Sequence, residues 1–204
     1  MGHDPSHWGD RRRVRVGLLG GSFNPAHAGH RHVAQAALRR LRLDQVWLMV
    51  SPGNPLKPTT GMAAPASRLA SARRIADGRR IVATDIESRL GTRYTVDTLR
   101  TLRRRFPRTR FVWLMGADNL AELPAWHAWP AIFRAVPVAV LARPAYSVKA
   151  LAGKAARRFS TARRSARFGP FLAGTAPPVW VFLHTRLHPA SASAIREGRV
   201  GRAG

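Results

Sequence analysis

The stretch GGSFNPAHAGH, residues 20–30, decides the fold of this chain. It follows an apolar run at residues 14–19 that has the composition of a buried strand, and it precedes residues 31–43, where apolar side chains recur at helical spacing. Glycines at the end of a strand let the backbone approach a ligand closely, and a helix N-terminus offers N–H groups to an anion. His27 and His30 add donors that can become charged. The pattern predicts a phosphate-binding turn between a strand and a helix.

The composition indicates one globular domain. The chain has 204 residues, 45% of them hydrophobic, so we expect a single domain over residues 1–204, with residues 1–13 as a basic and potentially flexible extension. The absence of cysteine excludes disulfide scaffolds, thiolate zinc sites and cysteine nucleophiles, and it fits a cytoplasmic protein. No run reaches the ~18 apolar residues of a spanning helix, so we expect no membrane partner. The sequence does not fix an oligomeric state.

The chain is strongly basic, with 35 lysines and arginines against 10 acidic residues and a net charge of +25. Such a charge attracts nucleic acid at low salt, suits an enzyme with polyanionic substrates, or reflects base composition in an arginine-rich genome. The arginines are scattered through all segments rather than gathered on one motif. We therefore favour the last two explanations together and expect no specific nucleic-acid partner.

Strands and helices are predicted to alternate, which is typical of a parallel sheet with helices on both faces. The expected strands are residues 15–19, 45–50, 80–84, 110–115, 136–141 and 179–183, and the expected helices are 29–42, 65–77, 95–106, 126–135 and 191–197. Right-handed crossovers would bring the ends of the first and fourth strands together at a ligand crevice. Residues 51–65 are predicted to be a long loop. Residues 145–178 are expected to be either a surface helix with a loop or partly disordered.

The sequence His27-Ala28-Gly29-His30 resembles the HxGH signature of the nucleotidyltransferase superfamily. Four further segments, in the same order, are similar to those of bacterial nicotinate-nucleotide adenylyltransferases: SPGNPLKP at 51–58, TRYTVDTL at 92–99, MGADNL with LPAWHAW at 115–129, and SASAIR at 191–196. The last departs from the family's ISSTxIR element at positions 190 and 192. The resemblance implies a Rossmann-like fold and the reaction of ATP with nicotinate mononucleotide to give nicotinate adenine dinucleotide and pyrophosphate. The alternatives are a superfamily enzyme with a nicotinamide-mononucleotide or phosphopantetheine acceptor, or a non-catalytic basic nucleic-acid-binding protein.

The resemblance also implies roles for residues that would handle phosphate. His30 would stabilise the α-phosphate, His27 would contact the triphosphate, and Arg196 would grip the β- and γ-phosphates, as suits a guanidinium fork. The expected ATP-binding set is completed by Gly20, Gly21, Ser22, Phe23, Gly116, Asp118 and Ser193. Asp118 is equally well placed to accept a ribose hydroxyl or to cap a helix. Mg²⁺ is expected to be held mainly by the substrate phosphates, and we reject a zinc site built from His27, His30 and His32.

The acceptor side is expected to be aromatic. Trp126 would stack on the pyridine ring, whereas Trp129 is expected to belong to the core. The resemblance implies that backbone N–H groups near Thr95 and His127 read the nicotinate carboxylate. The remaining candidates for binding the nicotinate nucleotide are Tyr94, Asn54 and Lys57. The side chains of His32, His127, His184 and His188 are expected to be structural or solvent-facing.

Overall fold

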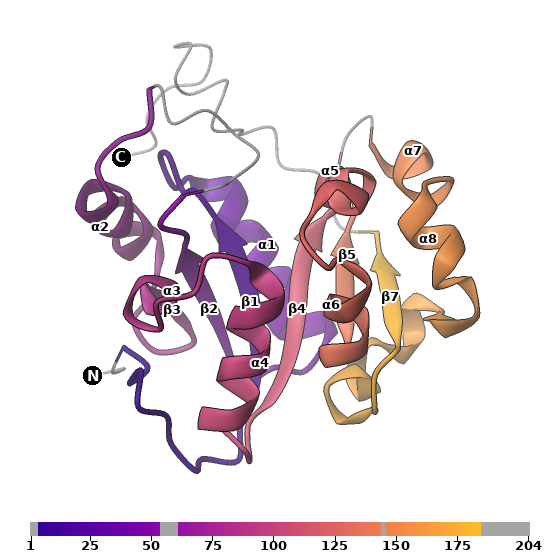
Figure 1. Ribbon diagram of the computed structural model, residues 1–204, viewed down its shortest axis with the longest axis horizontal. Helices are drawn as coiled ribbons and strands as arrows, with labels where there is room; N and C mark the ends of the chain where they lie inside the picture. Colours follow the sequence, from indigo (N-terminus) through magenta and orange to yellow (C-terminus); the bar gives the residue numbers. More distant parts are fainter. Residues whose placement is uncertain (1–3, 54–60, 144–145, 185–204) are drawn as a thin grey trace.

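The computed structural model describes residues 4–53, 61–143 and 146–184. Within these residues the strands form one parallel sheet of order β3-β2-β1-β4-β5-β7-β6 (Figure 1). The strands are β1 Arg15–Gly21, β2 Gln45–Val50, β3 Ile81–Thr84, β4 Arg110–Gly116, β5 Val138–Leu141, β6 Arg163–Arg164 and β7 Trp180–Leu183. The Rossmann-like α/β prediction is confirmed.

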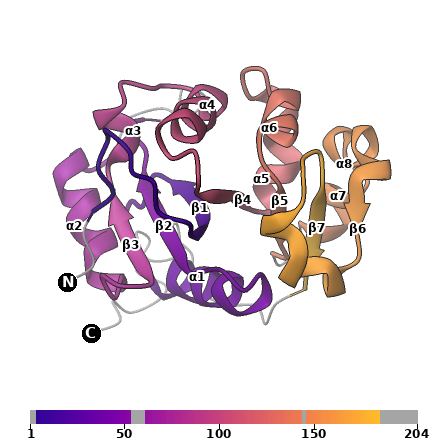
Figure 2. The ribbon, with the colours of Figure 1, turned by 90° about the horizontal axis from the view of Figure 1, so that it is seen from below.

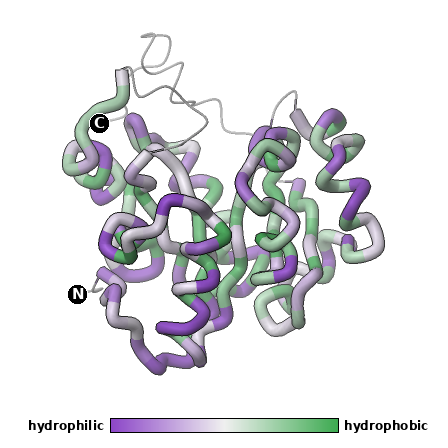
Figure 3. Tube along the Cα trace, in the orientation of Figure 1, coloured by the Kyte–Doolittle hydropathy of each residue, from purple (hydrophilic) through white to green (hydrophobic). Residues whose placement is uncertain are grey.

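The strands are runs of apolar residues because both faces of the sheet are covered. Five of the six residues of β2 are buried, and Figure 3 shows the strands as a hydrophobic interior. The six predicted strands are present with small shifts at their ends. One shift has a clear cause: β5 begins at Val138 rather than at residue 136 because Pro137 has no N–H to donate to a neighbouring strand.

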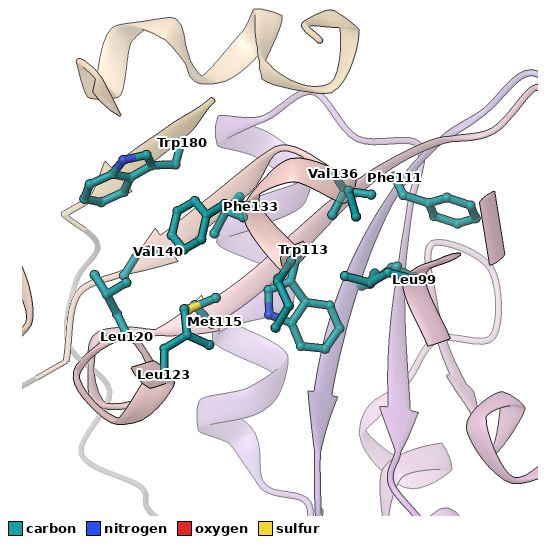
Figure 4. Close-up of a cluster of buried hydrophobic side chains, with 14 of the residues drawn as sticks. Leu99, Phe111, Trp113, Met115, Leu120, Leu123, Phe133, Val136, Val140 and Trp180 are labelled. Carbon is teal, nitrogen blue, oxygen red and sulfur yellow. The ribbon is translucent and has the colours of Figure 1, made fainter. Parts of the chain in front are cut away.

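Helices cover both faces of the sheet (Figure 2). The helices are α1 Ala28–Arg40, α2 Pro65–Ile75, α3 Ile86–Arg89, α4 Thr95–Arg105, α5 Ala117–Glu122, α6 Pro130–Ala135, α7 Ser147–Leu151 and α8 Lys154–Arg158, with the 3-10 turns η1 Leu123–Ala125, η2 Ser160–Ala162 and η3 Ala166–Gly174. Buried residues of α1, α2 and η3 belong to one hydrophobic core. Buried residues of α3 to α8 belong to the other, and Figure 4 shows some of its aromatic side chains, among them Phe111, Trp113, Phe133 and Trp180.

Residues 146–178 form short helices and turns that pack against the sheet, which agrees with the expectation of a helix and loop for this segment. The Phe159 ring stacks on Phe133 at 4.3 Å between centroids, and its carbonyl accepts a 2.8 Å hydrogen bond from the Trp180 indole. Small residues such as Ala155 and Ala162 are buried. In this segment buried alanines alternate with exposed arginines. Alanine is only weakly hydrophobic, so the periodicity is too weak to predict the short helices from the sequence.

The predicted helix at 126–135 is shorter than expected. It begins at Pro130, because proline at the first helical position needs no N–H partner, and residues 123–125 form the separate turn η1. The helix predicted from residue 95 is confirmed and ends at Arg105, two residues before Pro107. The short helices α3 and α5 were not predicted.

The N-terminal segment lies against α3 and α4. Arg89 of α3 forms an ion pair with Asp4 at 2.8 Å, and Arg105 of α4 donates a hydrogen bond to the His7 carbonyl.

The described residues contain no helix that is long and apolar enough to cross a membrane.

Candidate active site

The site lies where the order in which the chain adds strands to the sheet reverses. From β1, the chain adds β2 and β3 on one side and β4, β5 and β7 on the other, and β1 pairs directly with β4. Ligands of parallel sheets bind at such a point, beside the carboxyl ends of the strands. The turn after β1, which leads to α1, and the helix α5 after β4 both begin at this edge. The predicted crevice between the first and fourth strands therefore corresponds to a switch point of the fold.

Two histidines form the start of α1. His27 is the N-cap, and its Nδ1 accepts a 3.1 Å hydrogen bond from the Gly29 N–H. His30 Nδ1 accepts a 3.3 Å hydrogen bond from the His27 N–H, which completes a reciprocal capping box. The two rings lie 3.9 Å apart between centroids. Because Nδ1 of each ring faces a backbone N–H, Nε2 is the ring nitrogen that each histidine has left to donate to a ligand.

The surroundings of His30 keep it neutral. Burial lowers the pKa of His30 well below its usual value, and the positive potentials of His27 and Arg143 lower it further. The Phe23 ring packs beside it at 4.8 Å between centroids. His30 is therefore a neutral Nε2–H donor at pH 7.

The turn between β1 and α1 is tightly shaped. Phe23 is buried and has a φ of 49°, a left-handed conformation that costs a non-glycine residue about 1 kcal/mol. A Cβ on Gly20 would lie 2.7 Å from the Trp113 ring, so this position has no room for a side chain. The Ser71 hydroxyl of α2 accepts from the Ala26 N–H at 3.1 Å. Its single proton is shared between the carbonyls of Arg68 at 2.8 Å and Phe23 at 3.2 Å. Tertiary contacts thus hold a turn that local preferences disfavour.

Asp118 and Arg143 face each other after β4 and β5. Arg143 Nε lies 3.8 Å from Asp118 Oδ1, and neither of these buried atoms has a hydrogen-bond partner among the described residues. A Cβ on Gly116 would collide with Asp118 Oδ1 and lie 3.0 Å from Arg143 Nε, which explains the glycine. The capping alternative for Asp118 is wrong: Gly116 is the N-cap of α5, and no side chain caps that helix.

Sequence reasoning missed Arg143. The available signal was its place directly after the fifth strand, one strand from β4, but the many arginines of this chain obscure it. Its charge contributes to the low pKa of His30, which places it in the electrostatic surroundings of the HxGH turn.

Residues predicted for the acceptor come together from two loops. Tyr94 immediately precedes α4, whose first residue is Thr95, and its ring lies 4.4 Å from the His127 ring. Trp126 follows η1 and is partly buried against the hydrophobic core, whereas Trp129 is buried within it, as expected. Trp126 is therefore in an irregular segment rather than at a helix start.

Four predicted site residues, Asn54, Lys57, Ser193 and Arg196, lie outside the described residues. His188 lies there too, and His184 is exposed. Within the part of the chain that the structure describes, no three histidine or acidic side chains are grouped so that they could hold a metal ion.

Comparisons with known proteins agree on one family. A family model described as cytidylyltransferase-like matches residues 18–198. A protein of Gluconacetobacter diazotrophicus is 59% identical over 93% of this chain and 88% of its own length. A protein of Gluconobacter oxydans is 60% identical over 90% of this chain and 94% of its own length. Both are named "Probable nicotinate-nucleotide adenylyltransferase".

The fold is shared with a distant solved structure. The nicotinic acid mononucleotide adenylyltransferase of Plasmodium falciparum, complexed with NaAD, superposes with a TM-score of 0.64 over 90% of this chain and 83% of that chain, at 14% identity. At such low identity this likeness concerns the fold alone. The bacterial relatives carry the assignment, since they are similar over almost the whole of both chains. The protein belongs to the nicotinate-nucleotide adenylyltransferase family of nucleotidyltransferases.

Proposed function

We propose that this protein transfers the adenylyl group of ATP to nicotinate mononucleotide, giving nicotinate adenine dinucleotide and pyrophosphate. This is a step of NAD biosynthesis. The observation that carries the proposal is the pair of capped histidines at the β1/β4 switch point, because both present an Nε2–H donor beside a helix N-terminus. The named relatives support the same activity.

The reaction makes few covalent demands on the protein. An ionised phosphate oxygen of the mononucleotide attacks the α-phosphorus of ATP, and the bond from this phosphorus to the bridging oxygen breaks as pyrophosphate leaves with the electron pair. The attacking group is already ionised, so no general base is needed. Catalysis therefore depends on positioning and on donors aimed at the developing charge.

We assign this electrostatic work to His30 and His27. The His30 Nε2–H donates to the α-phosphate, and this hydrogen bond strengthens as negative charge gathers on that phosphate. His27 contacts the remaining phosphates from the adjoining turn. The turn residues Gly20, Gly21, Ser22 and Phe23 let the phosphates approach the backbone, and Ser193 and Arg196 complete the phosphate contacts.

Asp118 and Arg143 are suited to the ribose of ATP. A ribose hydroxyl both donates and accepts, so it can bond to the carboxylate and to the guanidinium of this incompletely bonded pair. The glycine at position 116 leaves room for the two side chains to meet, because a Cβ there would collide with Asp118 Oδ1.

Mg²⁺ enters with ATP in this proposal. The described side chains near the phosphate turn are histidines, an arginine and one carboxylate already facing that arginine, a set that fits a metal held by phosphates and water rather than by the protein. When bound, the ion neutralises charge on the phosphates.

On the acceptor side, Trp126 stacks on the pyridine ring, with Tyr94 beside it. The N–H groups near Thr95 and His127 donate to the nicotinate carboxylate, and Asn54 and Lys57 complete the acceptor contacts. We propose that the protein works in the cytoplasm on these small molecules, without a specific nucleic-acid partner.

Pyrophosphate release from ATP with a panel of acceptor nucleotides tests the proposal. N–H donors suit both carboxylate oxygens but oppose the NH₂ of the amide, so nicotinate mononucleotide should exceed nicotinamide mononucleotide in kcat/KM by roughly ten- to a hundredfold. Equal efficiency would replace the acid-specific assignment with a dual one. Turnover with phosphopantetheine alone, or binding to nucleic acid without any turnover, would favour the corresponding alternative.

A further inference from the structure

Helix α2 carries a fully buried arginine to which the proposed reaction assigns no role. Arg68 is 1% exposed, and burial lowers the pKa of its guanidinium. Among the described residues no carboxylate forms an ion pair with it. A charge buried without a counter-ion is costly, so this position needs a specific physical reason.

All of the hydrogen bonds of Arg68 go to backbone carbonyls. Its Nε donates to Ala63 at 2.9 Å, its Nη1 to Ser22 at 2.9 Å and Ser51 at 2.7 Å, and its Nη2 to Pro52 at 3.2 Å. Ser22 lies in the turn after β1, and Ser51 and Pro52 follow β2. Ala63 precedes Ala64, the N-cap of α2. One side chain therefore joins the carboxyl ends of two neighbouring strands. Only the planar fork of arginine can reach all four carbonyls.

The Ser22 contact fixes the direction of a backbone donor. In a trans peptide the C=O and the following N–H point in opposite directions. Because Arg68 holds the Ser22 carbonyl toward α2, the Phe23 N–H points away from α2. This N–H donates to no acceptor among the described residues. It also lies in the turn whose glycines and histidines face the proposed phosphate site.

Ser71 contributes to the same arrangement one helical turn later. It holds the Phe23 carbonyl and the Ala26 N–H, as described above. Arg68 and Ser71 lie on one face of α2, three residues apart, and both are buried. Arg68 is charged and Ser71 is neutral. Substitutions at the two positions therefore distinguish an electrostatic contribution to the turn from a mechanical one.

We propose that Arg68 is a positioning residue for ATP: it orients the Phe23 N–H toward the triphosphate and places a fixed positive charge behind the phosphate turn. This inference rests on the proposed function and deepens it. The missing countercharge of Arg68 is supplied by the phosphates when they bind. A charge in the interior is screened far less by salt than the surface arginines of this chain, so it retains its effect at physiological ionic strength.

Steady-state kinetics of the full chain test this role, because KM does not depend on the fraction of enzyme that is folded. Arg68→Met should raise KM for ATP about tenfold or more, and Arg68→Lys, which keeps the charge but loses the fork, by a smaller factor of about three to ten. KM for the mononucleotide should change less than about threefold. Ser71→Ala should raise KM for ATP less than Arg68→Met does, since it removes only turn contacts. Arg74→Met, exposed on the same helix, is the matched control and should leave both constants unchanged.

An unchanged KM for ATP in folded Arg68→Lys and Arg68→Met, with only a lower melting temperature, would overturn the proposal and make Arg68 purely structural. If Arg68→Met does not fold, Arg68→Lys alone decides. The rise in Tm on addition of inorganic pyrophosphate tests this proposal separately from the proposed function, because the measurement needs neither turnover nor an acceptor nucleotide. The wild type should be stabilised and Arg68→Lys less so, even if the acceptor were misassigned; equal stabilisation would contradict the role of Arg68.

Discussion

The buried carboxyl of Glu87 provides a quantitative test of the packing that leads into Tyr94. This carboxyl is buried on α3, where burial raises its pKa to about 7, against the opposing effect of a 3.1 Å hydrogen bond from the Thr98 hydroxyl of α4. The Glu87 carbonyl also accepts from the Thr92 N–H at 3.1 Å, and Thr92 and Thr98 share a 2.8 Å hydrogen bond. The network holds the residues that lead into Tyr94.

The sign follows from the raised pKa. The folded protein keeps a proton on Glu87 up to about pH 7, whereas the unfolded chain loses it near 4.5. The stability contributed by the neutral carboxyl is therefore complete below the unfolded value and is lost as the pH rises through the folded one. The difference between the two pKa values corresponds to about 3 kcal/mol at neutral pH.

Glu87→Gln removes this loss because glutamine stays neutral and its amide oxygen can still accept from Thr98. Relative to the wild type, the variant should gain about 2–3 kcal/mol between pH 5 and pH 8, which is roughly 5–10 °C in Tm for a chain of this size. Thermal melts at both pH values measure the change. The comparison of two proteins at each pH cancels the titration of all other groups. A constant difference in Tm across this range would refute the buried, neutral carboxyl.

Three further predictions concern the substrates. His30→Ala should lower kcat by about 10²–10³ with an unchanged circular dichroism spectrum. The pKa of His30 is lowered in the folded state, so the stability that the neutral ring contributes is present above pH 6.5 and is lost as the pH falls below it. His30→Gln should therefore flatten the decrease in Tm between pH 7 and pH 5. Trp126→Ala should raise KM for nicotinate mononucleotide and leave KM for ATP within about twofold, since stacking touches only the pyridine ring; a rise in the ATP constant alone would contradict this. Arg196→Ala should weaken ATP and pyrophosphate binding by ~2–4 kcal/mol, with partial rescue by lysine, and competition with pyrophosphate measures the loss.

The sheet and the histidine pair could be predicted because their signals are local. Each strand is a run of apolar residues between polar segments, and β2 has the predicted bounds. The parallel order then follows from the handedness of the crossovers, which brings β1 beside β4. His27 and His30 sit three residues apart at a helix start, so their mutual capping depends on neighbours in sequence.

The charged parts of the site could not be predicted in this way. Arg143 meets Asp118 only through the pairing of β4 with β5, and the sequence places them 25 positions apart. Asp118 itself lies one residue inside α5, because Gly116 rather than a side chain ends the strand and begins that helix. The lowered pKa of His30 also depends in part on Arg143, which is distant in sequence.

Arg68 illustrates why composition is a poor guide to function in this chain. Six of the eight α-helices in the described residues carry arginines. Those on the surface are screened by salt within about 8–10 Å. Arg68 differs only in lying on the buried face of α2, beside Ser71 and Ala72, where small side chains leave room for a guanidinium. A net charge of +25 can attract anions to the molecule in general. Recognition of a triphosphate at one turn requires donors with fixed directions, and in this fold buried contacts from α2 and α1 fix them.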